Sequence, residues 1–133
     1  MYTMKEASKK VGISYETLKY YCKEGLIPDV KRDKNNYRIF DEQNIAWLKG
    51  LQCLRKCGMG IKDMKLYMNY CLEGPSTIPE RKAMLSEYKE SLLKQIKEIN
   101  ECIEFIDNKQ AFYDDVLSGK IEYISNLIDV KNK

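Results

Sequence analysis

The 133-residue sequence contains no histidine, only three prolines and no long run of apolar residues. Without histidine, it can form neither a Cys–His nucleophilic pair nor a Cys/His zinc site. It also has no nucleotide-binding glycine loop and no paired-carboxylate motif, so we expect that the chain is not an enzyme. No segment has the length and hydropathy of a membrane span or a signal peptide, which predicts a cytoplasmic protein with no membrane partner.

Five cysteines are present, and their number and spacing bear on the redox state of the chain. An odd number at irregular intervals does not suit a disulfide framework, and cytoplasmic thiols are kept reduced. We therefore expect free thiols at Cys22, Cys53, Cys57, Cys71 and Cys102.

Charge is distributed unevenly along the chain. Residues 1–73 carry 14 Lys and Arg against 9 Asp and Glu, a net charge of +5, whereas residues 74–133 carry 9 against 11, a net charge of −2. The basic first part favours a polyanionic partner.

One long amphipathic segment dominates the second half of the sequence. Its apolar residues recur at steps of four and three, and neither Gly nor Pro interrupts it between Pro79 and Gly119. This narrow stripe predicts a coiled-coil helix over residues 80–118. So small a chain cannot bury the stripe by itself, and we therefore expect a homodimer. The stripe, in which only Gln110 is polar, consists of Leu92, Ile96, Ile99, Ile103, Ile106, Gln110, Tyr113 and Leu117.

The first residues predict a helix-turn-helix. Thr3 and Glu6 form a capping box before a short helix that ends at Gly12, and Ser14 caps a second helix that ends before Gly25. The second helix either contacts nucleic acid or is only a solvated face with two half-buried tyrosines. Its side chains suited to phosphates and base edges are Ser14, Tyr15, Thr17, Lys19, Tyr20 and Tyr21.

Residues 30–40 predict a basic β-hairpin. Asp33 to Asn36 are turn-forming residues between β-forming ones, and the segment holds four cations and one anion. A basic hairpin directly after a helix-turn-helix is typical of a wing that binds flanking phosphates. Two further helices, from Glu42 to about Cys57 and from Ile61 to Leu72, should complete the core.

The order of these parts, together with several short motifs, resembles the MerR family of transcriptional regulators. The similarity covers roughly residues 2–72, and the long helix lies where that family dimerises through an antiparallel coiled coil. The motifs are Val11-Gly12-Ile13-Ser14, Thr17-Leu18-Lys19-Tyr20-Tyr21, Gly25-Leu26-Ile27-Pro28, Tyr37-Arg38, Asp41-Glu42 and Gly58-Met59-Gly60-Ile61.

Three positions depart from the family pattern. Lys19 stands where arginine is usual, Cys22 where glutamate is usual, and Asn35-Asn36 where a glycine is common. Lysine keeps the charge of arginine but loses its bidentate fork, so the departure at Lys19 bears on operator preference more than on binding itself.

The resemblance implies a domain organisation. Residues 1–73 would form a winged helix-turn-helix DNA-binding domain and residues 74–79 a linker, with Thr77 capping the next helix. Residues 80–118 would form an antiparallel coiled-coil dimerisation helix, and residues 119–133 a short packing segment with apolar residues at helical spacing. The implied fold class is mainly α.

The resemblance also implies a function. The homodimer would bind double-stranded promoter DNA between elements that are spaced too far apart, and would bend and untwist the DNA so that RNA polymerase engages both elements. Groove and phosphate contacts would come from Tyr15, Thr17, Lys19, Tyr20 and Tyr21 in the second helix, and from Arg32, Tyr37 and Arg38 in the wing.

A thiol is the implied sensor. The stretch Gln52-Cys53-Leu54-Arg55 is similar to the NmlR/AdhR-like branch, which senses thiol and aldehyde stress through a lone cysteine after the wing. Nearby cations would favour a reactive thiolate at Cys53, and Cys57 could act as a resolving thiol. Equally, both cysteines can be ordinary core residues.

Metal-sensing members place cysteines at the start of the dimerisation helix and in the loop beyond it. Residues 74–90 and 118–133 hold neither Cys nor His, so we expect no metal site and no other cofactor.

Two alternatives stay open. The first is a regulator of the same fold that senses a small apolar ligand, or acts constitutively, without thiol chemistry. The second is a coiled-coil adaptor whose winged front end binds protein.

Overall fold

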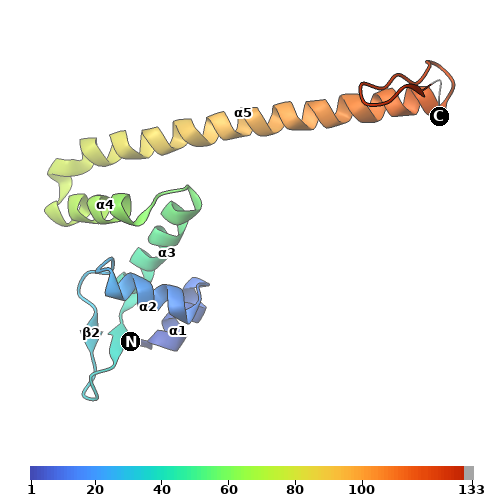
Figure 1. Ribbon diagram of the computed structural model, residues 1–133. Helices are drawn as coiled ribbons and strands as arrows, with labels where there is room; N and C mark the ends of the chain where they lie inside the picture. Colours follow the sequence, from blue (N-terminus) through green and yellow to red (C-terminus); the bar gives the residue numbers. More distant parts are fainter. Residues whose placement is uncertain (131–133) are drawn as a thin grey trace. The chain divides into compact units, whose positions relative to one another are not determined.

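The computed structural model describes residues 1–130 and is mainly helical, which confirms the predicted fold class (Figure 1). The described chain forms two compact units, Met1–Glu90 and the part from Ser91 onward. The elements in chain order are β1 (Tyr2–Thr3), α1 (Met4–Val11), α2 (Tyr15–Lys23), β2 (Lys31–Arg32), β3 (Arg38–Phe40), α3 (Glu42–Lys56), α4 (Ile61–Glu73), the 3₁₀ helix η1 (Pro75–Thr77) and α5 (Ile78–Leu117).

The predicted capping box at the start of α1 is confirmed. The Glu6 backbone N–H donates to Thr3 Oγ1 at 3.1 Å, and the Thr3 N–H donates to Glu6 Oε1 at 3.0 Å. This second bond lowers the pKa of the Glu6 carboxyl. Gly12 ends the helix with a φ of 82°, a left-handed conformation that suits glycine.

The predicted hairpin is present, and it belongs to a three-stranded antiparallel sheet in the order β1-β3-β2. Lys31 pairs with Ile39 and Arg32 with Arg38. On its other edge, β3 pairs with β1, with Tyr2 opposite Phe40 and Thr3 opposite Ile39. The strand β1 therefore ties the N-terminus to the wing.

The core lies where α1, α2, α3 and the sheet meet, and the start of α4 covers it. Phe40, Leu18, Leu26 and Leu48 are fully buried there. Trp47 packs at its edge and donates its indole N–H to the Leu26 carbonyl at 2.7 Å. The remaining buried apolar residues are Ala7, Tyr21, Ile27, Ile45, Leu51, Met59 and Met64.

The connection between α4 and α5 differs from the predicted linker over residues 74–79. It contains the 3₁₀ helix η1, and α5 already begins at Ile78. The predicted cap at Thr77 also needs correction, because its hydroxyl donates to the carbonyls of Tyr70 and Gly74 and accepts from Arg81 Nε. Thr77 thus serves the end of α4 and not the start of α5.

Helix α4 is joined to α5 at both of its ends. Arg81 Nη2 donates to the carbonyl of Tyr70 at 3.0 Å and to that of Gly74 at 2.6 Å. In the first turn of α4, the Asp63 carboxylate accepts a short hydrogen bond from the Tyr88 hydroxyl, which raises the pKa of Tyr88 to about 12.

In the second unit, α5 ends at Leu117, one residue before the predicted end. Residues 118–130 form no α-helix. They turn back beside the end of α5 (Figure 1), where the Tyr123 and Phe112 rings lie 6.4 Å apart. The last three residues of the predicted packing segment 119–133 lie outside the described residues.

Candidate nucleic-acid interface

The wing takes its shape from one aspartate. Asp33 Oδ1 accepts the backbone N–H groups of Asn35 at 2.9 Å and Tyr37 at 3.0 Å, which fixes the turn. Asn36 adopts a φ of 65°, a left-handed conformation that asparagine tolerates. Arg32 Nη1 donates to the Asn36 carbonyl at 2.8 Å, so part of this guanidinium braces the hairpin.

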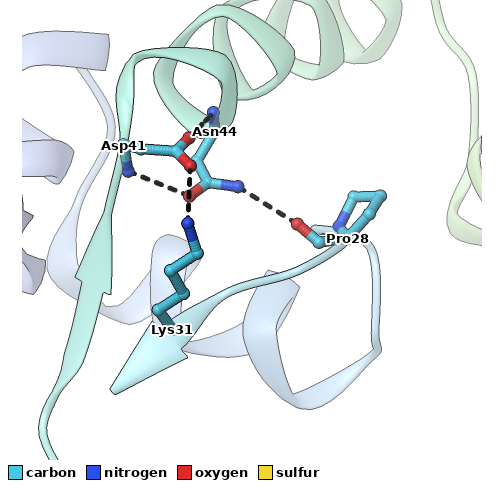
Figure 2. A network of polar contacts seen from close by, with 4 residues as sticks. All are labelled: Pro28, Lys31, Asp41 and Asn44. Carbon is cyan, nitrogen blue, oxygen red and sulfur yellow. Dashed lines mark hydrogen bonds and ion pairs between the residues drawn. The ribbon is translucent and has the colours of Figure 1, made fainter. Parts of the chain in front are cut away.

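The base of the wing is anchored to the start of α3 (Figure 2). Asn44, which is buried, donates its side-chain amide to the Pro28 carbonyl at 3.1 Å and exchanges two hydrogen bonds with Asp41 in a capping box. Lys31 Nζ of β2 lies 3.7 Å from Asp41 Oδ2. These contacts hold the hairpin in a fixed direction relative to the core.

Helix α2 presents its tyrosines on different sides. Leu18 and Tyr21 face the core, while Tyr15 and Tyr20 are 48% and 47% exposed. Ser14 caps the helix by accepting the Thr17 N–H at 3.0 Å, and its own hydroxyl donates to Thr17 Oγ1 at 2.8 Å. Both hydroxyls therefore already take part in the cap.

A first groove, of about 330 Å³, lies between α2, the wing and the start of α1. It brings together four predicted residues, Tyr15, Arg32, Tyr37 and Arg38, and adds Lys5. Sequence reasoning missed Lys5. No local pattern could have identified it, because only tertiary packing brings the start of α1 beside α2 and the wing.

A second groove, of about 380 Å³, lies on the other side of α2. Thr17 and Tyr20 line it together with Arg55 of α3 and with the start of α4. Gly60 is the N-cap residue of helix α4, and it provides no side-chain hydrogen bond to the first turn. A helix N-terminus without such a cap offers backbone N–H groups to an anion. Arg55 adds a positive charge to the lining, and Glu16 adds a negative one. Sequence reasoning had not assigned Arg55 or Gly60 to this interface.

Two of the predicted DNA-binding residues lie outside both grooves, and the prediction for a third residue, Tyr21, needs correction. Ser14 and Lys19 are exposed on α2 but line neither groove. Tyr21 is only 2% exposed, so its ring belongs to the core and cannot enter a DNA groove. Its hydroxyl is buried at the edge of the second groove without a hydrogen-bond partner among the described residues.

The cysteines occupy different surroundings. Cys53 is exposed and Cys57 half-buried at the end of α3, where the Cys57 N–H donates to the Cys53 carbonyl at 3.1 Å. Half-buried Cys22 lies near the wing. Burial raises the pKa of its thiol, although the guanidinium groups of Arg38 and Arg32 act in the opposite direction.

Within residues 1–130, no three His, Cys, Asp or Glu side chains are grouped so that they could hold a metal ion. In the same part of the chain, no helix combines the length and apolar character needed to span a membrane.

A helix-turn-helix with a wing, with cations and tyrosines gathered around its second helix, defines a class of DNA-binding regulators. The family comparison is specific within that class. Residues 2–71, more than half of the chain, match the model of the MerR HTH family regulatory protein. The chain therefore belongs to the MerR family.

Individual relatives agree with this assignment. An uncharacterised HTH-type transcriptional regulator of Haemophilus influenzae is 38% identical over 112 residues, which are 84% of this chain and 83% of that protein. The regulator AdhR of Bacillus subtilis is 36% identical over 89 residues, 67% of this chain and 64% of AdhR.

Solved structures extend the similarity beyond the first unit. HiNmlR, described as a MerR family regulator lacking the sensor domain and bound to promoter DNA, has a TM-score of 0.73 at 37% identity, covering 88% of this chain and 93% of HiNmlR. A MerR family regulator from Listeria monocytogenes has a TM-score of 0.79 at 29% identity, covering 90% and 91%. The predicted resemblance to the NmlR/AdhR-like branch is confirmed, as is the prediction that the chain is a regulator and not an enzyme.

Proposed function

We propose that this protein is a cytoplasmic, homodimeric transcriptional regulator that binds double-stranded promoter DNA through α2 and the wing. The observation that carries the proposal is the first groove, where Lys5, Arg32 and Arg38 lie around Tyr15 and Tyr37. Cations and hydroxyl groups arranged beside a recognition helix suit two neighbouring backbone phosphates. The promoter DNA bound to HiNmlR supports the same partner here.

The second groove supports a phosphate contact on the other side of α2. Tyr20 and Arg55 line this groove beside the uncapped start of α4. With contacts on both sides, α2 would be held in the major groove while the DNA backbone is gripped at two points. Such a grip suits the proposed bending and untwisting, after which RNA polymerase would engage both promoter elements.

Dimerisation through α5 rests on its exposed apolar stripe. Ile96, Ile99, Ile103 and Ile106 each expose half or more of their surface, which is unusual for aligned isoleucines on a monomer. Ile78 and Leu85 are also exposed, in the same seven-residue register as Leu92. The proposed seam therefore includes the start of the helix. Gln110 would fix its register.

The charges of α5 favour antiparallel pairing. Residues 78–97 hold five cations and three carboxylates, whereas residues 98–117 hold six carboxylates and one cation, Lys109. In an antiparallel pair the basic half of each helix lies beside the acidic half of its partner, while a parallel pair brings the acidic halves together.

A spin-label distance tests the orientation. With the native cysteines replaced by serine, a label at Glu80→Cys lies near the start of α5 in each protomer. At about 1.5 Å per residue, antiparallel pairing separates the two labels by about 50 Å, and parallel pairing by about 10 Å. A short distance would overturn the antiparallel dimer without affecting the DNA-binding proposal.

The proposed switch is modification of Cys53 by aldehydes or oxidants. Cys53 is exposed, and Cys57 lies four residues later, at the C-cap position of α3. With an aldehyde, the Cys53 sulfur would add to the carbonyl carbon and the thiol proton would pass to the carbonyl oxygen. Cys53→Ser is expected to keep DNA binding and lose induction by aldehydes, whereas Cys102→Ser is the matched control. Full induction of the Cys53→Ser variant would remove this proposal.

DNA binding is tested by fluorescence anisotropy with a duplex from the region upstream of the protein's own gene. Neutralising one phosphate contact reduces the magnitude of the slope of log K against log [salt] by about 1. We expect this change for Lys5→Gln and no change for Lys97→Gln, an exposed lysine of α5. Equal slopes for the two variants would remove Lys5 from the interface.

A further inference from the structure

An open cleft of about 410 Å³ lies in the second unit, between the last turns of α5 and the segment that turns back beside them. A ring contact between Phe112 and Tyr123 holds this segment against the helix. The lining consists of three apolar residues and three polar ones, namely Phe105, Phe112 and Ile124, and Asn108, Lys109 and Asn126.

The cleft lies away from the proposed dimer seam. At about 100° per residue, Phe105, Asn108, Lys109 and Phe112 point roughly a quarter to a half turn around the helix axis from the stripe. Phe105 is 63% exposed at a position that a two-stranded coiled coil leaves uncovered. Dimerisation through α5 therefore leaves the cleft open.

The chemistry of the lining selects a class of ligand. Two phenylalanine rings and an isoleucine provide an apolar wall for a flat ring. Lys109 is the only charged residue of the lining, and its Nζ lies 5.9 Å from the centroid of the Phe105 ring. The side-chain amides of Asn108 and Asn126 add N–H donors. An apolar wall with a few convergent donors and one cation is typical of a site for a small organic anion.

We propose that this cleft binds a small aromatic carboxylate, with its ring against Phe105 and Phe112 and its carboxylate at Lys109. The proposal goes beyond DNA binding and requires neither Cys53 nor the first groove. If the protein is a ligand-sensing regulator, this proposal names where the ligand binds and to which chemical class it belongs.

The test uses the full-length protein and two probes of the same shape, the anion 2-naphthoate and its neutral counterpart 2-naphthamide. Amide resonances of ¹⁵N-labelled protein are followed during titration with each probe. A ligand of this size that fits the cleft should bind with a Kd of about 1 mM or lower. Lys109→Gln removes the cation, and Lys94→Gln, an exposed lysine on the same helix, is the matched control.

We expect the shifts to concentrate at residues 105–112 and 121–126, and the wild type to prefer the carboxylate about fivefold. Lys109→Gln should abolish this preference while both probes still bind, and Lys94→Gln should keep it. Phe112→Leu, which retains most of the apolar volume, should weaken both probes. Absence of shifts at about 5 mM, or shifts centred on residues 1–90, would overturn the site. An unchanged preference in Lys109→Gln would overturn the ligand class.

Discussion

Substitution of Arg81 is expected to reduce the stability of the first unit, because this side chain binds the carbonyl groups at the C-terminus of α4. The last carbonyl groups of a helix lack partners within the helix. Arg81 Nη2 reaches the carbonyls of Tyr70 and Gly74, and Nε reaches Thr77 Oγ1 at 3.1 Å. The Arg81→Ala substitution removes all three hydrogen bonds at once.

The size of the effect follows from these contacts. A hydrogen bond from a charged donor stabilises a protein by about 1.5–3 kcal/mol. The Thr77 hydroxyl also donates to both carbonyls, and water can reach the half-buried guanidinium, so the three bonds should not contribute additively. We expect Arg81→Ala to reduce the free energy of unfolding by about 2 kcal/mol, and Arg81→Lys by about 1 kcal/mol because lysine lacks the planar fork.

Urea unfolding at a fixed protein concentration measures this loss, since the stability of a dimer depends on concentration. The midpoint should fall with little change in slope, and the melting temperature should decrease by about 6 °C for Arg81→Ala. Lys49→Ala, at an exposed position in the interior of α3, is the control. A loss below about 0.5 kcal/mol for Arg81→Ala, or an equal loss for Lys49→Ala, would refute the assignment.

Two further predictions concern single side chains. The Tyr88 hydroxyl donates a hydrogen bond to Asp63, and this bond raises the pKa of Tyr88 to about 12. The bond therefore stabilises the folded state fully below the ordinary tyrosine pKa of about 10. This stabilisation is lost as the pH rises through 12. Up to pH 10, Tyr88→Phe should reduce the free energy of unfolding, measured with urea, by at most about 1 kcal/mol, because solvent screens this partly exposed pair. A difference between wild type and variant that persists unchanged at pH 12 would contradict the assignment. Asn36 has a φ of 65°, so Asn36→Val should destabilise the wing by about 1–2 kcal/mol while Asn36→Gly is tolerated. Equal unfolding midpoints for these two variants would argue against the left-handed turn.

Helix ends of the first unit were predictable from sequence because their causes are local. These helix ends are set by caps that contact residues no more than four positions away. The caps are Thr3 with Glu6, Gly12, Ser14 and Asp41. The strand β1 was missed because two residues carry no periodic pattern, and only pairing with β3 defines it. After Gly119, the sequence predicted only a short packing segment, and its course, which brings Tyr123 against Phe112, depends on tertiary contacts.

The candidate interface was predictable in part. Residue types identified Tyr15, Tyr37 and Arg38, which the fold gathers around one groove. Burial of Tyr21 was also readable, because it lies three residues after Leu18 and thus on the same face of the helix. Lys5 and Arg55 come from other helices, and their approach to α2 depends on tertiary packing, which no local pattern encodes.

The central claim is that a symmetric dimer of this chain binds promoter DNA through α2 and the wing. Hydroxyl-radical footprinting on the DNA upstream of its own gene tests this claim most directly. The account predicts two protected half-sites related by twofold symmetry and separated by a whole number of helical turns, in a complex that dissociates as salt rises. Protection of a single half-site, or no salt-sensitive complex in the presence of excess competitor DNA, would contradict it.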